Sequence, residues 1–248
     1  LVAGDDRQLP PIGETFEHEV DGRMIGDSLY GFLKSNGVLE CILDETFRMN
    51  GPLTVFPSQK YYEGQFFSAA EATSKKLPLN ATWREGLSDI ETAILDPNHP
   101  ICVLIHDGPH CSTQNPFETQ IVTRLTKLLF DRVKPNPTQP NWAKEVFWQS
   151  ELAIISPHRA QNAAIREELA KASWGKDAVV ETVERIQGRE RSSIIVSYTV
   201  SDPEFAASEA SFIFSPQRLN VAVTRSKYKL ILIVSRRLLE TLPTDEAD

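Results

Sequence analysis

The stretch LAIISPHRAQNAAIREELAKAS at residues 152–173 decides the fold class, because an apolar run passes directly into a helical pattern. Leu152–Ile155 is apolar at every position, as expected of a strand that is buried on both faces of a sheet. Arg159–Ser173 then carries apolar side chains at helical spacing, and a second apolar run, Ala178–Val183, follows it. This order predicts a strand, a helix and a parallel strand, which together form one βαβ unit.

The same alternation continues on both sides of this unit. Further buried strands are predicted at Ile101–Ile105, Ile194–Thr199 and Leu230–Val234, with a sixth strand at Leu39–Leu43. Further helices are predicted at Phe117–Val133 and at about Pro216–Ser226. The expected fold is therefore α/β, a doubly wound parallel sheet with helices on both faces.

Local signals refine two segments of this plan. Asn115 as N-cap, Pro116 at the first helical position and Glu118 at the third predict a capping box at the start of the 117–133 helix. Residues 56–99 show few periodic signals, so we place them outside the sheet, as a less regular region that could form a small subdomain.

Composition narrows the class of protein. With 248 residues, 41% hydrophobic and 24% charged, the chain is expected to be globular rather than disordered. Its apolar runs are too short to cross a membrane, and no leader is visible. Three cysteines without metal-ligand spacing predict no metal site and a reduced intracellular protein, cytoplasmic or, in a eukaryote, nuclear. The opening in an apolar run at Leu1 suggests a fragment of a longer protein.

The net charge of −8 is unevenly distributed. Residues 1–100 carry 8 basic and 16 acidic side chains, whereas residues 101–248 carry 18 of each. Six cations and no acid fall between Arg218 and Arg237. The acidic total argues against a general polyanion binder, but a local basic strip remains compatible with phosphate contacts.

Two polar segments near the amino terminus could carry chemistry. GDDRQLPP at 4–11 follows an apolar Leu1–Ala3; if that run ends a strand, Gln8 lies at the sheet's carboxyl edge, where it could contact a phosphate and a water. LDETFRM at 43–49 places Asp44 and Glu45 after an apolar run, as magnesium-holding acids are placed in P-loop enzymes. The simpler alternatives are a Pro-ended loop and a solvated turn, with Arg48 the more notable residue of the second segment.

No phosphate-binding loop accompanies these acids. The chain has a single Gly-Lys pair, Gly175-Lys176, but Asp177 follows it and Ala170 stands where the first glycine of GxxxxGK[ST] would be. A complete P-loop kinase or other self-sufficient NTPase is therefore excluded.

Two further segments lie in the second half of the chain. ETVERIQGRE at 181–190 contains Gly188, which permits close backbone approach, flanked by cations and a glutamate suited to phosphate and ribose hydroxyls. RLNVAVTRSK at 218–227 spaces Arg218 and Arg225 seven residues apart, so a continuous helix would put both on one outward face. A solvated amphipathic helix is the alternative for this last segment.

Together these segments resemble the motifs of superfamily 1 helicases, in the family's order. GDDRQLPP resembles motif III, LDETFRM motif IV, TVERIQGRERSSIIVS motif V and RLNVAVTRSK motif VI, with FPSQKYYEG at 56–64 and AIISPHRAQ at 153–161 similar to accessory segments. The closer similarity is to the 5′-to-3′ branch, which includes the RNA helicase of nonsense-mediated decay and bacterial DNA-acting relatives. The resemblance runs from the first residues to about Ser235.

The resemblance implies a RecA-like domain of the P-loop NTPase class, the second of the two in such helicases. Residues 1–13 would end the first RecA-like domain, and residues 14–248 would form the second. Motifs I and II, which precede motif III in the family, are not in the sequence. The lysine that cradles phosphate and the acids that hold magnesium would then belong to an upstream domain of the same polypeptide.

For the nucleotide, the resemblance implies ATP with magnesium, bound between the two domains. Gln8 would sense the γ-phosphate and place the attacking water, while Arg48 and Arg225 would act as arginine fingers. Phe47 would stack on adenine where relatives commonly have Tyr, and Glu190 would accept hydrogen bonds from the ribose hydroxyls. Gly188 would allow the backbone to approach the nucleotide closely. Arg218 would support Arg225 or touch phosphate.

For nucleic acid, the resemblance implies a single strand crossing the opposite edge of the domains. Ser156, His158 and Thr182 match positions that touch the strand backbone, DNA being favoured over RNA. The implied function is the C-terminal motor domain of an ATP-dependent helicase or translocase, inactive without the upstream domain. A non-catalytic helicase-like module that binds nucleic acid or a partner is the alternative; two γ-phosphate arginines argue against it and the missing P-loop argues for it.

Overall fold

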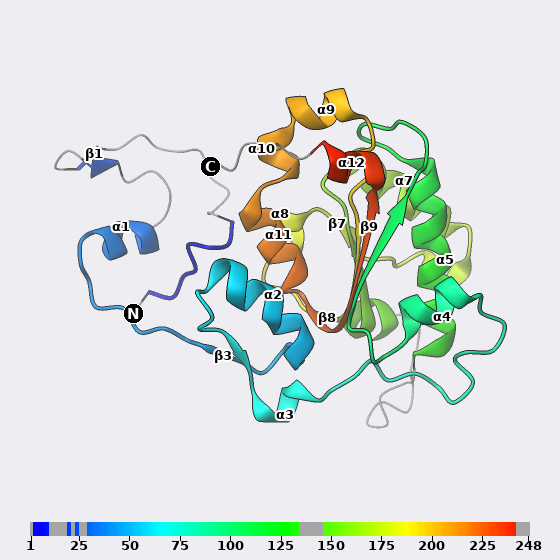
Figure 1. Ribbon diagram of the computed structural model, residues 1–248, viewed down its shortest axis with the longest axis horizontal. Coiled ribbons are helices and arrows are strands. Elements are labelled where there is room, and N and C mark those ends of the chain that lie inside the picture. Colours follow the sequence, from blue (N-terminus) through cyan, green and yellow to red (C-terminus); the bar gives the residue numbers. More distant parts are fainter. Residues whose placement is uncertain (1, 10–18, 21–22, 25–28, 134–145, 242–248) are drawn as a thin grey trace.

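A computed structural model describes residues 2–9, 19–20, 23–24, 29–133 and 146–241. Its centre is a five-stranded parallel sheet in the order β5-β9-β8-β6-β7. The bounds are Ile101–His106 for β5, Ser226–Ser235 for β9, Arg191–Ser197 for β8, Leu152–Ile155 for β6 and Val180–Glu181 for β7. The predicted α/β fold is confirmed, and because all five strands run the same way, their loops collect at two opposite edges of the sheet (Figure 1).

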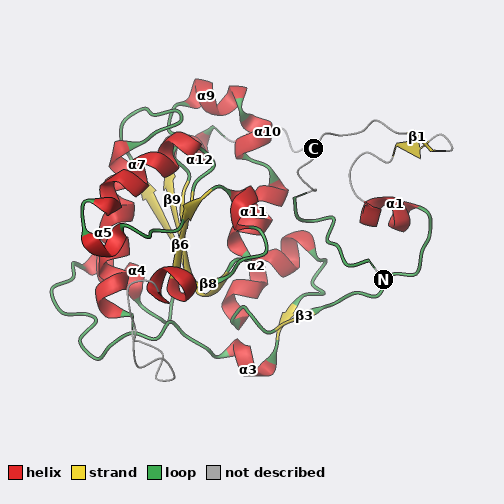
Figure 2. Cartoon of the chain, turned by 180° about the vertical axis from the view of Figure 1, so that it is seen from behind, coloured by secondary structure: helices red, strands yellow, loops and turns green. Residues whose placement is uncertain are grey.

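Helices cover both faces of this sheet (Figure 2). On one face lie α5 and α7; on the other lie α2, α8 and α11. The bounds are Pro116–Arg132 for α5, Arg159–Ala170 for α7, Gly51–Tyr61 for α2, Val183–Ile186 for α8 and Pro216–Val223 for α11. Short helices α9 (Pro203–Ser208), α10 (Ala210–Ile213) and α12 (Arg236–Glu240) lie beyond the carboxyl ends of the strands.

The remaining elements are short. Upstream of the sheet are β1 (Glu19–Val20), β2 (Arg23–Met24), α1 (Leu29–Ser35) and β3 (Glu45–Thr46), which pairs with β4 (Phe67–Ser68). Between β4 and β5 come α3 (Ala70–Thr73) and α4 (Asp89–Leu95); the π-helix η1 (Phe147–Glu151) and the 3-10 helix η2 (Ser173–Gly175) flank β6 and α7. Residues 56–99 thus lie outside the main sheet, as predicted.

The two cores follow from side-chain alternation along the buried strands. In β8, Ile195 packs with Leu125, Leu129 and Ile165 of α5 and α7, whereas its neighbour Ile194 packs on the other face. There the partners come from α2 and α11: Met49 just before α2, Leu53, Val221 and Ala222. Because successive strand residues point to opposite faces, one apolar strand joins both layers.

Four sequence predictions need correction here. Leu39–Leu43 forms no strand: Leu39 is 97% and Leu43 86% exposed, because an apolar run becomes a strand only where a neighbour pairs with it. The 178–183 strand is confined to Val180–Glu181, since the chain turns into α8 at Val183. The 159–173 helix ends at Ala170. Of the predicted strand end Leu1–Ala3, Val2 and Ala3 form no strand; Leu1 and residues 10–13 of the predicted first-domain segment lie outside the described residues.

The N-cap of α5 is confirmed, but the predicted capping box is wrong. Asn115 Oδ1 accepts from the N–H of Glu118 at 3.1 Å, yet the Glu118 side chain does not return to the Asn115 backbone. It is fully buried and bonded to strand β8 instead. A reciprocal capping box is present at α4, between Ser88 and Glu91.

No helix in the described part of the chain is both long and apolar enough to span a membrane.

The central position of β8 gives a stability prediction. Ile195 is fully buried, so Ile195→Ala should lower the free energy of unfolding by roughly 2–5 kcal/mol through lost burial and a cavity. Ile90→Ala, at a side chain that is 65% exposed, should change it by less than about 0.5 kcal/mol. Urea unfolding of both variants measures the difference; similar midpoints would contradict a core centred on β8.

Candidate functional site

The strand directions sort the predicted site residues into two groups. Glu190 precedes β8 and Arg225 precedes β9, so both lie at the amino edge of the sheet, where Arg48 joins them. Ser156 follows β6 and Thr182 follows β7, at the carboxyl edge. Arg48, Glu190 and Arg225 therefore lie at the opposite edge from Ser156 and Thr182. Arg218, also predicted for phosphate, is an exception, because it lies over Phe212, the ring that packs against His158 beyond β6.

Arg225 is almost completely buried at the amino edge, with 4% of its surface exposed. Its Nε donates to the carbonyl of Val221 at 3.0 Å, and its Nη2 donates to Thr224 Oγ1 at 3.0 Å and to Gln8 Oε1 at 3.2 Å. Among the described residues it forms no ion pair with a carboxylate. Burial lowers the pKa of Arg225 to about 10, and the charge of Arg48 acts in the same direction, so the side chain stays cationic at neutral pH.

Arg48 reaches the same place from the segment before α2. Its Nη1 donates to the carbonyl of Thr224 at 3.1 Å, and its Nε donates to Glu190 Oε2 at 2.6 Å. Lys227 Nζ lies 2.8 Å from Glu190 Oε1, so both oxygens of this carboxylate are engaged by cations. Burial by itself would raise the pKa of Glu190, but hydrogen bonds from Lys227 and Arg48 lower it overall.

The loop of residues 4–9 packs beside Arg225 rather than ending a strand. Gln8 Nε2 donates to Asp5 Oδ2 at 2.6 Å, and Tyr62 Oη donates to the same oxygen at 2.7 Å. Asn220 Nδ2 donates to the Arg7 carbonyl at 2.8 Å and to Tyr62 Oη at 2.9 Å. Burial, followed by the bond to Asp5, raises the pKa of Tyr62 to about 12, so its hydroxyl stays protonated.

Three other predicted nucleotide residues have different surroundings. Phe47 is 63% exposed. Gly188 is exposed with φ +79°, the left-handed region that glycine adopts without strain. Arg218 ion-pairs with Glu184 and lies over the Phe212 ring at 4.1 Å. The prediction that Arg218 and Arg225 share a helix face is wrong, because α11 ends at Val223 and Arg225 turns inward beyond it.

The predicted strand-contacting residues are only partly accessible. Ser156 is fully buried and shares a hydrogen bond of 2.9 Å with Thr199. His158 is the N-cap residue of α7 and packs against the rings of Phe205 and Phe212; burial lowers its pKa. Thr182 is the half-exposed N-cap residue of α8, with no capping hydrogen bond from its side chain.

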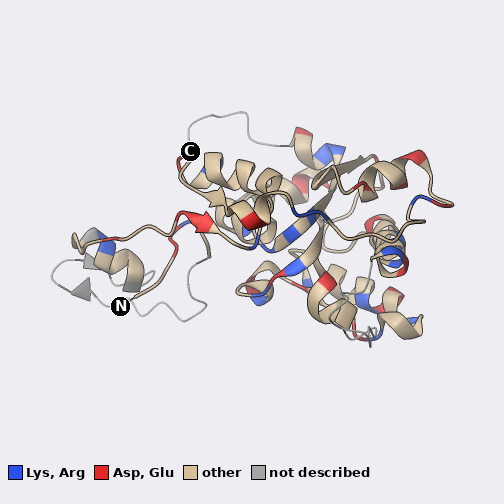
Figure 3. Ribbon diagram, turned by 90° about the horizontal axis from the view of Figure 1, so that it is seen from below, with Lys and Arg blue, Asp and Glu red and all other residues tan. Residues whose placement is uncertain are grey.

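The basic strip read from the sequence does not form a continuous surface. Arg225 and Lys229 are buried, and the other cations between 218 and 237 are held locally: Arg218 by Glu184, Lys227 by Glu190, Arg236 by Asp107 and Arg237 by the Gly108 carbonyl. Figure 3, which views the molecule from below Figure 1, shows basic and acidic positions side by side. Sequence spacing cannot show this, because the partners come from distant segments.

Sequence reasoning missed three residues of the amino-edge site, namely Asp5, Tyr62 and Asn220. Asn220 carried a usable signal, since it is a polar residue between Leu219 and Val221 on the sheet-facing side of a short helix. Its Oδ1 is buried without a hydrogen-bond partner in the described part of the chain. Buried groups of this kind call for a water or a ligand as a partner.

The chain is similar to known helicases. Residues 25–237 match the family described as AAA domain. The chain is 28% identical over 251 residues to the DNA replication ATP-dependent helicase/nuclease DNA2 of Bos taurus, covering 94% of this chain and 22% of that protein. It is also 28% identical to the ATP-dependent helicase NAM7 of Saccharomyces cerevisiae, covering 96% of this chain and 23% of that protein. The chain thus spans about a fifth of the length of these curated relatives.

Among solved structures, the C-terminal domain of a possible DNA helicase from Lactobacillus plantarum is 15% identical, with a TM-score of 0.35. That likeness covers 60% of this chain and 82% of the other.

The lowered pKa of Glu190 gives a pH prediction. Folding favours the ionised form of Glu190. Its contribution to the free energy of unfolding is therefore fully present above the ordinary carboxyl pKa of about 4.3 and is lost as the pH falls through the lowered pKa of the folded state. Because the pair is partly exposed, Glu190→Gln should destabilise by roughly 0.2–1 kcal/mol at pH 7. In urea unfolding this difference should shrink as the pH falls through the lowered pKa of Glu190, whereas Glu167→Gln, on the exposed face of α7, should change the free energy of unfolding at pH 7 by less than about 0.5 kcal/mol. A difference that grows on acidification would contradict the sign.

Proposed function

Because the chain belongs to the AAA domain family, as the C-terminal domain of a superfamily 1 helicase of the 5′-to-3′ branch, we propose that it is the second wall of an ATP site in a motor that moves on single-stranded nucleic acid. In this proposal its parent polypeptide is an ATP-dependent helicase or translocase. An upstream RecA-like domain of the same polypeptide supplies the other wall.

The observation that carries the proposal is the convergence of two guanidinium groups. Arg225 is buried and forms no ion pair with a carboxylate of the described residues, and Arg48 donates to the carbonyl of the adjacent Thr224. Burial and then the charge of Arg48 lower the pKa of Arg225, so its buried charge is unfavourable unless an anion compensates it. A transferring phosphoryl group provides such an anion, and guanidinium donors stabilise the charge that it develops.

The neighbouring residues fit this chemistry. Gln8 already contacts Arg225 through Oε1, so it is positioned to respond to whatever Arg225 binds and to orient an attacking water. Glu190 fixes Arg48 from one side, and its role toward ribose requires that Lys227 or Arg48 release one carboxylate oxygen. Phe47 offers an exposed aromatic face for a base. Gly188 lets the backbone approach. Arg218 is paired with Glu184 and lies over Phe212, so we assign it only an indirect supporting part.

The resemblance to superfamily 1 helicases assigns magnesium mainly to the upstream domain, which in this proposal also cradles the phosphates. The exposed apolar side chains of residues 38–43, Leu39 and Leu43 above all, support a packing partner on this side of the chain.

The carboxyl edge is the proposed track for the strand. Ser156, His158 and Thr182 gather there, and the N–H groups at the start of α7 add donors for backbone phosphates. Contacts of this kind do not depend on base sequence and weaken with salt. Single-stranded DNA is the favoured track, since the name of the DNA2 relatives refers to DNA replication.

The proposed cycle uses both edges. Arg48 and Arg225 hold the closed state of the two domains while the γ-phosphate is present, and lose that hold when hydrolysis removes it. The equilibrium between closed and open states shifts because the two arginines interact differently with the nucleotide in each. Alternating grip at the carboxyl edge would turn this shift into stepping along the strand.

The proposal predicts a kinetic signature in the parent polypeptide. Arg225→Ala should reduce strand-stimulated kcat for ATP by about 10³-fold or more, the usual contribution of such an arginine. Arg124→Ala, on the exposed side of α5, should leave kcat unchanged. Steady-state ATPase assays with and without single-stranded DNA and RNA measure this, and the better-stimulating polymer identifies the track. Equal kcat for both variants would favour the non-catalytic binding module.

The 248-residue chain on its own should fold but show no ATP turnover, because Gln8, Arg48 and Arg225 form one wall only. Circular dichroism checks the folding and a phosphate-release assay checks the turnover. Sustained hydrolysis by this chain, abolished in Arg225→Ala, would contradict the need for a second domain.

A further inference from the structure

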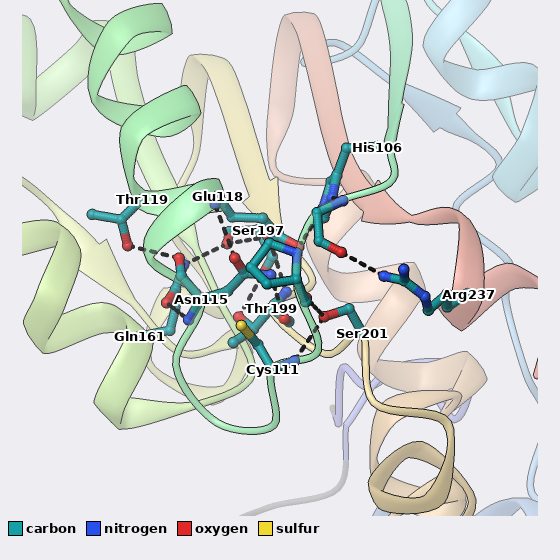
Figure 4. Close-up of polar contacts among 12 residues, drawn as sticks. His106, Cys111, Asn115, Glu118, Thr119, Gln161, Ser197, Thr199, Ser201 and Arg237 are labelled. Atoms are coloured by element: carbon teal, nitrogen blue, oxygen red, sulfur yellow. Dashed lines mark hydrogen bonds and ion pairs between the residues drawn. The ribbon is translucent and has the colours of Figure 1, made fainter.

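A buried polar cluster around Glu118 lies at the carboxyl edge of the sheet (Figure 4). Its hydrogen bonds join the ends of β5, β6 and β8 to the starts of α5 and α7. Its centre is Glu118, whose carboxylate is fully buried although the residue occupies the third position of α5, where glutamate normally faces solvent. A buried charge in such a place is retained at a cost, so it requires an explanation.

Both oxygens of the Glu118 carboxylate accept hydrogen bonds. Oε2 accepts from Ser197 Oγ at 2.5 Å and from the N–H of Thr199 at 3.0 Å. Oε1 lies 3.0 Å from His106 Nε2, and the N–H of Gly108 donates to Nδ1 of the same ring at 3.1 Å. Since Nδ1 accepts, the ring proton lies on Nε2, and a neutral His106 donates it to Glu118.

Thr199 is held in a conformation that its side chain disfavours. Its φ is +71°, in the left-handed region, where a β-branched residue is an outlier. Three of its groups are fixed: the N–H by Glu118, the carbonyl by Asn115 Nδ2 at 2.9 Å, and Oγ1 by Ser156 Oγ at 2.9 Å. Strain of this size persists only where the surroundings overdetermine it, and such residues concentrate at functional sites.

The contacts of Thr199 lead to the strand track. Ser156 Oγ, which bonds to Thr199, also accepts from the N–H of His158 at 3.4 Å. A short chain of contacts therefore runs from Glu118 through Thr199 to Ser156 and His158, two of the three residues proposed to touch the strand. Ser156 is itself buried, and its backbone is held by Glu181 and Asn162, so it is the orientation of its hydroxyl that depends on Thr199 rather than on solvent.

We propose that Glu118 is a positioning residue for single-strand binding: it holds Thr199 in the left-handed conformation, and Thr199 in turn sets Ser156 and His158 at the track. This inference rests on the proposed function for its strand. It assigns Glu118 no contact with nucleic acid or nucleotide. The Arg48–Arg225 site at the opposite edge should therefore be insensitive to changes at Glu118.

Glu118→Gln in the parent polypeptide tests this contact. Because the ring proton of His106 faces the side chain, the new amide must turn its oxygen toward His106, which withdraws the acceptor from Thr199. Single-stranded DNA should then bind about 5- to 20-fold more weakly in fluorescence anisotropy, as expected for loss of a charge-assisted hydrogen bond. The KM for ATP should not change. Glu118→Asp, which keeps the charge but shortens the reach to Thr199, should act in the same direction if Glu118→Gln does not fold.

The matched control is Glu91→Gln. Glu91 holds the same third helical position in α4, and its contacts are to Ser88 and Arg124, away from this edge. It should leave strand affinity unchanged.

A double-mutant cycle separates positioning from general structural support. Glycine adopts the left-handed conformation without strain, so in a Thr199→Gly background Glu118→Gln should weaken strand binding by less than about 2-fold. An equal loss in both backgrounds would overturn the proposal. In Glu118→Gln, hydrogen exchange of the Thr199 amide should accelerate while exchange of the β8 amides stays the same. Unchanged exchange at Thr199 would also overturn the proposal. If the unaltered protein binds no strand, the proposed function fails; the exchange result still decides whether Glu118 positions Thr199.

Discussion

The parallel pairing of β9 with β5 on one side and with β8 on the other is the constraint on which the rest of the structure depends. Parallel strands need crossover helices, so the chain must cover both faces of the sheet. The same direction for all strands gathers every strand-leading loop at one edge and every strand-following loop at the other. Two chemically different sites can then share one small domain without competing for the same loops.

The two edges of the sheet differ in how their buried charged side chains are paired. At the amino edge, Arg225 is buried and forms no ion pair with a carboxylate of the described residues, and in the proposed function a phosphate compensates its charge. At the carboxyl edge, both carboxylate oxygens of the buried Glu118 are hydrogen-bonded within the protein, in keeping with the positioning role that we propose for it. Desolvation is costly in both places. The difference lies in whether the protein itself supplies the compensation.

The sequence predicted the buried strands well because their signal is local: four of the six apolar runs became strands near the expected residues, and Ala178–Val183 gave a shorter one. It failed for Leu39–Leu43, whose composition equals that of the true strands but which has no pairing neighbour. It also failed for Glu118, because the capping-box pattern describes one helix end and cannot include Ser197 or Thr199, about eighty residues away.

By itself, then, the sequence determined the strand and helix order, the N-cap at Asn115 and the motifs that identify the family, all of which reside in neighbouring residues. Only the tertiary structure decided which cations are paired, that Arg225 meets Gln8, and that Arg218 does not share its face. The reason is physical: propensity and periodicity act over a few residues, whereas desolvation and charge pairing depend on what the fold brings together from distant segments.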